Sequence, residues 1–90
     1  MRTIHKFPVD AGTNTVIMPR NADILCVQTQ RGVPFIWAVV DDYKVTERRQ
    51  LHVVGTGHEM PPGVGRSEYI GTWQEADVFV WHLFAEKGAA

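Results

Sequence analysis

The chain has 90 residues, a net charge of −1 and 44% hydrophobic residues. A chain of this size forms one small domain with a thin core, and its balanced charge excludes the strong attraction to nucleic acid or anionic membranes that a basic protein has. Its one cysteine, Cys26, excludes an internal disulfide and fits a reducing cytoplasm. We expect a single β domain over residues 1–86 and a flexible C-terminal tail over 87–90, without a signal peptide or membrane segment.

The chain consists of strand-like segments separated by turn-forming residues. In chain order these segments cover residues 3–9, 14–18, 24–30, 33–40, 45–54, 68–73 and 77–84. Pro8 indicates an edge strand at the N-terminus, and Gly71 inside a strand indicates a bulge or a close backbone approach. Segments 33–40 and 77–84 are apolar on both faces, which is typical of central strands. A helix over 46–51 is a local alternative, but its β-branched flanks favour a strand.

This pattern predicts an all-β fold with little or no helix. We expect a small antiparallel sandwich or partly open barrel of about seven strands, mostly in hairpin order. Residues 31–32 are placed to form a two-residue hairpin turn. That turn would set Cys26 opposite Trp37 and Gln28 opposite Phe35, with the Cys26 thiol buried and unreactive.

The long irregular segment of the chain is 55–66. Its glycines allow positive φ, so successive N–H groups can point at one phosphate, and Thr56 and His58 add side-chain donors. Arg66 supplies a planar cation suited to phosphate or carboxylate. The alternative is a strand exit that needs glycine only for its backbone, since Gly-x-Gly alone is not a dinucleotide motif. Rigid β scaffolds place function on such loops.

Aromatic side chains are the candidates for stacking on a nucleobase. Trp37 and Trp81 lie on the most apolar segments and are expected to be structural. Trp73 follows a glycine near a strand end and is the better surface candidate, with Tyr69 beside it. The candidate ligand-binding residues are therefore Gly55, Thr56, Gly57, His58, Arg66, Tyr69 and Trp73.

The histidines do not indicate a metal site or a catalytic group. None of the four, His5, His52, His58 and His82, has a partner at the short spacing of a metal-binding motif. His58 with Glu59 is a conceivable acid–base pair, but no recognisable nucleophile accompanies it. We therefore favour a binding protein over an enzyme and expect neither a cofactor nor a metal.

Several short segments of the chain resemble those of a known family. They are Ile24-Leu25-Cys26-Val27-Gln28, Trp37-Ala38-Val39-Val40-Asp41, Gly55-Thr56-Gly57-His58, Tyr69-Ile70-Gly71-Thr72-Trp73-Gln74 and Trp81-His82-Leu83-Phe84. In this order, over nearly the full chain, they resemble a family of small bacteriophage proteins of unknown function. The likeness departs near Pro61-Pro62-Gly63. It implies a phage origin and a compact domain, and it implies no reaction.

Short phage genes often encode proteins that act against host defences, and this expectation comes from the class of protein and not from particular residues. We therefore expect a non-enzymatic, homo-oligomeric protein that sequesters a small anionic, nucleotide-like immune signal in the host bacterial cytoplasm. The 55–58 amides and Arg66 would hold phosphate, and Trp73 or Tyr69 would stack the base. The alternatives are a protein–protein inhibitor of a host defence protein, a minor structural or accessory phage protein, and a hydrolase with His58 as base. We expect neither a nucleic-acid polymer nor a membrane as partner.

Overall fold

The computed structural model describes residues 1–10, 13–64 and 67–87. The strands are β1 (Arg2–Pro8), β2 (Thr13–Pro19), β3 (Asp23–Gln30), β4 (Val33–Asp41), β5 (Thr46–Gly55), β6 (Glu68–Glu75) and β7 (Phe79–Ala85). No α-helix occurs in these ranges. In the same residues no helix has the length and apolarity needed to cross a membrane. The predicted all-β fold is confirmed, and segment 46–51 is strand.

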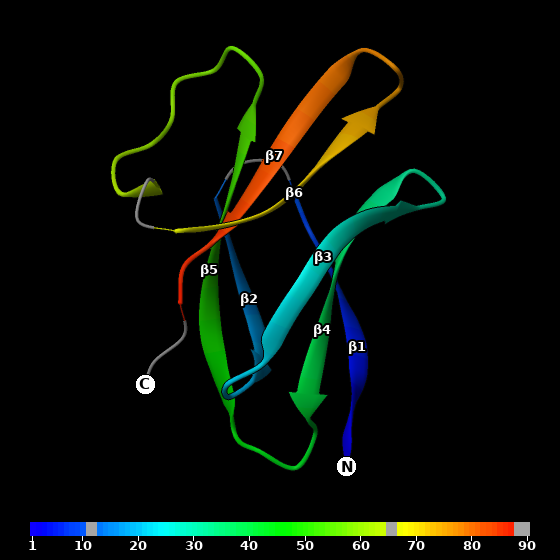
Figure 1. Ribbon diagram of the computed structural model, residues 1–90, viewed down its shortest axis with the longest axis vertical. Helices are drawn as coiled ribbons and strands as arrows, with labels where there is room; N and C mark the ends of the chain where they lie inside the picture. The colour runs from blue at the N-terminus through cyan, green and yellow to red at the C-terminus, as the bar shows by residue number, and fades with distance from the viewer. Residues whose placement is uncertain (11–12, 65–66, 88–90) are drawn as a thin grey trace.

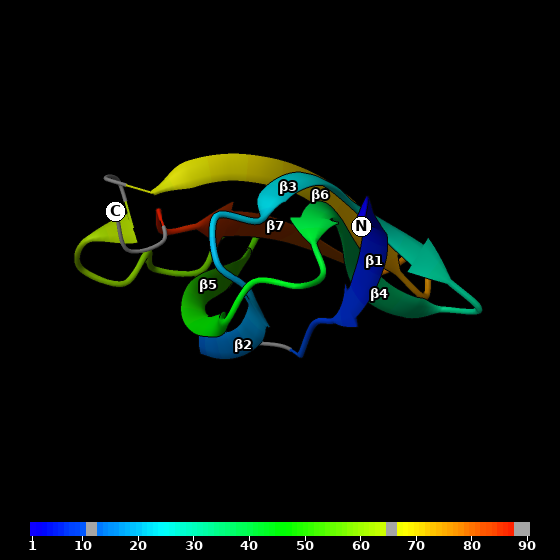
Figure 2. The same ribbon diagram turned by 90° about the horizontal axis from the view of Figure 1, so that it is seen from below.

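The strands form two antiparallel sheets (Figures 1 and 2). The three-stranded sheet has the order β1-β4-β3, and the four-stranded sheet has the order β2-β5-β7-β6. The predicted central strands, β4 and β7, lie inside their sheets, and β1 lies at an edge. The expected hairpin order is wrong for most of the chain. Of the strands described, only β3–β4 and β6–β7 are consecutive and paired, because β1 and β2 instead pair with the distant β4 and β5.

The main core fills the space between the sheets. Its largest fully buried side chains are Met18, Ile36, Leu51, Leu83 and Val40. These residues alternate with outward-facing ones along their strands, as the period of two requires. The two sheets therefore bury one apolar face each against the other.

Gly71 lies where β6 passes close to β3. The β6–β7 register shifts between Tyr69 and Gly71, and a Cβ added at Gly71 would lie 2.8 Å from Val27 Cγ1. Both predictions for this glycine, a bulge and a close approach, are confirmed. The missing side chain lets the bulged strand rest against the neighbouring sheet.

The β3–β4 hairpin has the predicted turn. Arg31 and Gly32 have φ values of 53° and 78°, and positive φ at both central positions is the requirement of a type I′ turn. The predicted pairs Cys26–Trp37 and Gln28–Phe35 are confirmed. The Cys26 thiol is half-buried rather than buried.

The connection from β5 to β6, residues 56–67, is here called the crossover loop. Both strands pair antiparallel with β7, so they run parallel to each other and the connection must pass over β7. Figures 1 and 2 show its described part on the side of the four-stranded sheet away from the other sheet. Val64 in the loop is fully buried and Val54 at the end of β5 is 7% exposed, yet neither belongs to the main core. The loop therefore has a buried anchor of its own.

Candidate functional site

The Gly55–His58 stretch is a tight turn at the end of β5. The His58 N–H donates to the Gly55 carbonyl at 3.0 Å, and Gly57 has a φ of 84°, which is the positive value that the third position of a type II turn needs. The Thr56 N–H donates to the Val80 carbonyl at 3.0 Å. Two of the amides predicted to hold a phosphate, those of Thr56 and His58, therefore already donate to carbonyl groups.

Gly55 is required for a steric reason. A Cβ at this position would lie 2.6 Å from His58 Nδ1 and 3.1 Å from Trp81 Cζ3. The imidazole occupies that space and meets the indole edge-on, with ring centroids 5.9 Å apart and planes at 72°. Glycine at 55 therefore lets His58 pack against Trp81.

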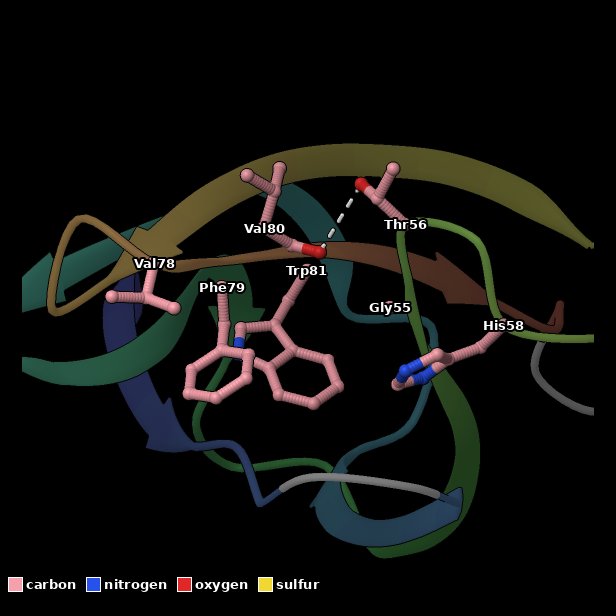
Figure 3. Close-up of a pocket in the computed structure, with 7 residues that line it drawn as sticks. All are labelled: Gly55, Thr56, His58, Val78, Phe79, Val80 and Trp81. Carbon is pink, nitrogen blue, oxygen red and sulfur yellow. Dashed lines mark hydrogen bonds between the residues drawn. The ribbon is translucent and has the colours of Figure 1, made fainter.

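One hollow opens on the side of β7 that carries Trp81, and we call it the inner hollow (Figure 3). It has a volume of about 290 Å³ and is lined by Gly55, Thr56, His58, Val78, Phe79, Val80 and Trp81. Figure 3 shows Phe79, Trp81 and His58 on one side of β7 and the side chains of Thr56 and Val80 on the other. The Phe79 and Trp81 centroids are 6.1 Å apart with planes at 32°. None of these lining residues is Asp, Glu, Lys or Arg, so the hollow offers aromatic faces to a planar group.

Trp81 also separates the inner hollow from a second depression. The second one has about 270 Å³ and is lined by Gly32, Val33, Pro34, Trp73, Glu75 and Trp81. The indole Nε1–H of Trp81 donates to Glu75 Oε2 at 2.8 Å, which fixes the ring between the two hollows. The two hairpin tips beside it expose apolar side chains, with Val33 46%, Val78 71% and Phe79 53% accessible.

The expectation that Trp73 is the surface tryptophan is wrong. Trp73 is 8% exposed and belongs to the main core, because β6 continues to Glu75 and pairs Trp73 with Trp81 on the inward face. Trp81, expected to be structural, packs against the core and also forms a wall of both hollows.

A third depression, which we call the outer hollow, lies on the other side of the turn. It has about 280 Å³ and is lined by Val54, Gly55, Thr56, Gly57, His58, Met60, His82 and Phe84. A row of hydrogen bonds borders it and is called the polar row. Thr56 Oγ1 lies 2.8 Å from His82 Nε2, His82 Nδ1 lies 2.9 Å from Thr72 Oγ1, and Thr72 Oγ1 lies 2.6 Å from the Tyr69 hydroxyl.

The structure brings most of the predicted ligand-binding residues to this turn. Gly55, Thr56 and His58 line both hollows and Gly57 lines the outer one, while Tyr69 joins them through the polar row. Trp73 lies in the core instead, and Arg66 falls outside the described residues.

Sequence reasoning missed Phe79, Trp81 and His82 as site residues. Their alternation along β7 was visible, but their roles follow from the register that sets Trp81 opposite Gly55 and His82 opposite Thr72. The pairing of β7 with both β5 and β6 is the signal that identifies them. Within the residues described, no three His, Cys, Asp or Glu side chains are grouped to hold a metal ion.

Comparison with known proteins gives one match. The family model described as "Domain of unknown function (DUF7352)" matches residues 1–90. No curated protein and no solved structure matches the chain.

Proposed function

The chain belongs to this family of unknown function, and we propose that it is a non-enzymatic binding protein whose inner hollow takes a planar aromatic group, the base of a small nucleotide-like ligand. The observation that carries the proposal is the convergence of three rings. His58, Phe79 and Trp81 approach one another from two elements around a hollow that carries no charged lining side chain. Stacking on such rings contributes about 1–3 kcal/mol per base and tolerates different bases.

The hollow supports the base end of the ligand more directly than its phosphate end. The Thr56 and His58 amides already donate to carbonyls. An anionic group would therefore rely on the His58 side chain at the rim, because the Thr56 hydroxyl lies on the other side of β7 (Figure 3). The ligand we propose is accordingly recognised by its ring, and its phosphate contributes little to the binding affinity.

The biological setting of the proposal comes from the resemblance to small bacteriophage proteins. Sequestration of a nucleotide-derived immune signal in the host cytoplasm is the role that fits a binding protein of this kind, and an oligomer would add stability to so small a core. This setting rests on family resemblance, whereas the ring-binding hollow rests on geometry.

Ligand binding can be tested by tryptophan fluorescence and thermal shift with matched pairs, adenosine against cyclic AMP and guanosine against cyclic GMP. We expect both members of a pair to bind within about threefold of each other, because stacking supplies most of the affinity. Phe79→Ala, at a side chain that is 53% exposed, should weaken binding about tenfold with an unchanged fold. The matched control is Tyr43→Ala, at a ring 75% exposed in the β4–β5 connection, which should leave binding unchanged.

Heating the complex separates sequestration from catalysis. A sequestering protein releases the ligand intact, whereas altered ligand would assign the protein to the hydrolases. The binding proposal fails if no nucleoside or nucleotide shifts the melting temperature or the fluorescence.

A protein–protein inhibitor is the second candidate, favoured by the exposed hairpin tips. Val33, Val78 and Phe79 present apolar side chains beside two hollows that share Trp81, and aromatic anchors of this kind dominate protein interfaces. Capture of a host defence protein that is lost with Val78→Asp and retained with Tyr43→Ala would favour this function over the first.

A further inference from the structure

We propose that the outer hollow is a second binding site, for a small apolar molecule that carries one neutral hydrogen-bond donor such as an alcohol. The site lies on the opposite side of the Gly55–His58 turn from the inner hollow. Its walls come from Val54, Met60 and Phe84, with His82 beside them. The proposal does not rest on nucleotide binding, since Phe79 and Trp81 do not line this hollow, although the two hollows share the turn residues Gly55, Thr56 and His58.

The size of the hollow fits one ring with a substituent. Its volume is about 280 Å³, and an apolar protein cavity of roughly 150 Å³ is known to take a benzene molecule. Val54 is only 7% exposed and Met60 is 47% exposed. The floor is therefore fixed, and the methionine has the adaptable side chain that suits a ligand-facing wall.

Both ring nitrogens of His82 form hydrogen bonds with threonine hydroxyl groups. Thr56 Oγ1 contacts Nε2 at 2.8 Å, and Thr72 Oγ1 contacts Nδ1 at 2.9 Å. The Tyr69 hydroxyl lies 2.6 Å from Thr72 Oγ1 and extends the row, while its ring packs on Phe84 with centroids 5.6 Å apart. The imidazole is thus fixed in orientation, whichever tautomer is present.

Counting hydrogens in the polar row shows what the ligand must provide. With the proton on Nε2, the imidazole donates to Thr56 Oγ1, and the Thr56 hydroxyl donates to the Val80 carbonyl, which lies 3.4 Å away. With the proton on Nδ1, the Thr56 hydroxyl donates to Nε2. A hydroxyl has one hydrogen and two lone pairs. In both arrangements the Thr56 hydroxyl already donates its one hydrogen, and at least one of its lone pairs accepts no hydrogen bond.

Thr56 Oγ1 therefore accepts one further hydrogen bond and donates none. A ligand head group that donates, such as an alcohol, satisfies it, whereas a ketone or an ether of the same shape does not. Figure 3 shows the Thr56 hydroxyl directed away from Trp81 and Phe79, toward Val80. The acceptor thus faces the outer side of the sheet.

The test uses two probes of nearly equal shape, 1-phenylethanol and acetophenone, titrated into protein labelled at its methionine methyl groups. The Met60 methyl resonance should shift with both probes, and that of Met18, which is fully buried in the main core, should not. We expect the alcohol to bind about three- to tenfold tighter than the ketone, the contribution of one hydrogen bond.

Substitutions at Thr56 test whether its hydroxyl causes the preference for the alcohol. Thr56→Val keeps the side-chain shape and should abolish the preference, while Thr56→Ser should retain it. Phe79→Ala, which alters only the inner hollow, should leave both affinities unchanged. The proposal is overturned if the wild-type protein binds the two probes equally, if the preference survives Thr56→Val, or if the probes leave the Met60 methyl resonance unshifted.

Discussion

The outer faces of the two sheets differ in what covers them. On the four-stranded sheet the crossover loop passes over β7, and Val54 at the end of β5 and Val64 in the loop are both buried without belonging to the main core. On the three-stranded sheet the outer face is shielded by side chains of its own strands. There the Lys6 ammonium lies 4.7 Å from the Phe35 ring centroid and 5.8 Å from that of Trp37. The first face is covered by a loop with a buried side chain, and the second is an amphipathic surface.

The difference shows why the site lies where it does. A loop anchored by a buried side chain holds its neighbours in fixed positions, and binding sites on β scaffolds need such support. The Gly55–His58 turn begins the crossover loop, and Val64 anchors the same loop further along. The outer face of the three-stranded sheet also has a depression, of about 390 Å³, lined by Lys6, Gln30, Arg31, Val33 and Phe35. Its lining comes from three strands and a hairpin turn, and no loop with a buried anchor contributes to it.

The largest effect is expected from removing the anchor of the crossover loop. Val64→Ala should lower the free energy of unfolding by about 1–3 kcal/mol, because it removes two methyl groups from a fully buried position and leaves a void. The measurement is the urea midpoint at an unchanged m-value. Val45→Ala, at a side chain that is 73% exposed, is the matched control and should change stability by less than about 0.5 kcal/mol. If the two variants lose equal stability, the loop is not an anchored structure.

The fold was predictable from the sequence where the signals are local. The two-residue turn at 31–32 fixes the β3–β4 register, so the pairs Cys26–Trp37 and Gln28–Phe35 followed from counting outward from it. The pairing of β1 with β4 and of β2 with β5 has no such local signal, because each joins segments separated by more than twenty residues. The expected hairpin order failed for that reason.

The position of the candidate site in the chain was predictable from the sequence, but only some of the residues that form it were. Its position in the irregular stretch after β5 followed from the glycines, but their purpose did not, because the need for Gly55 arises from His58 packing over it. The sequence pattern predicts that the 68–73 strand ends at Trp73, which would expose the indole, whereas β6 continues to Glu75. Burial of Trp73 depends on its cross-strand partner Trp81, which sequence position alone does not show.

A second, smaller effect is expected at the edge of the covered face, where His52 meets the C-terminal segment. His52 is 8% exposed, and its Nε2 lies 2.7 Å from Glu86 Oε2. Glu86→Ala should lower the free energy of unfolding by about 1 kcal/mol, because the imidazole loses its partner in a mostly buried setting. Glu86→Gln keeps an amide oxygen within reach and should lose less than half as much in the same urea titration. Equal losses would mean that packing of the Glu86 stem, and not the hydrogen bond, stabilises this segment.

The smallest effect is expected on the uncovered face, at Lys6. Its ammonium lies over the Phe35 and Trp37 rings and donates to Gln30 Oε1 at 2.5 Å. Cation–π contacts at exposed sites contribute about 0.5–1 kcal/mol, so Lys6→Ala should lower stability by about that amount. Lys6→Met retains a long apolar side chain over the rings without the charge, and comparison of the two variants separates the cation–π term from simple coverage. The cation–π term should also persist in 0.5 M NaCl, where surface ion pairs are screened. A loss from Lys6→Ala as large as that from Val64→Ala would contradict the contrast between the two faces, since it would make the uncovered face as important to folding as the covered one.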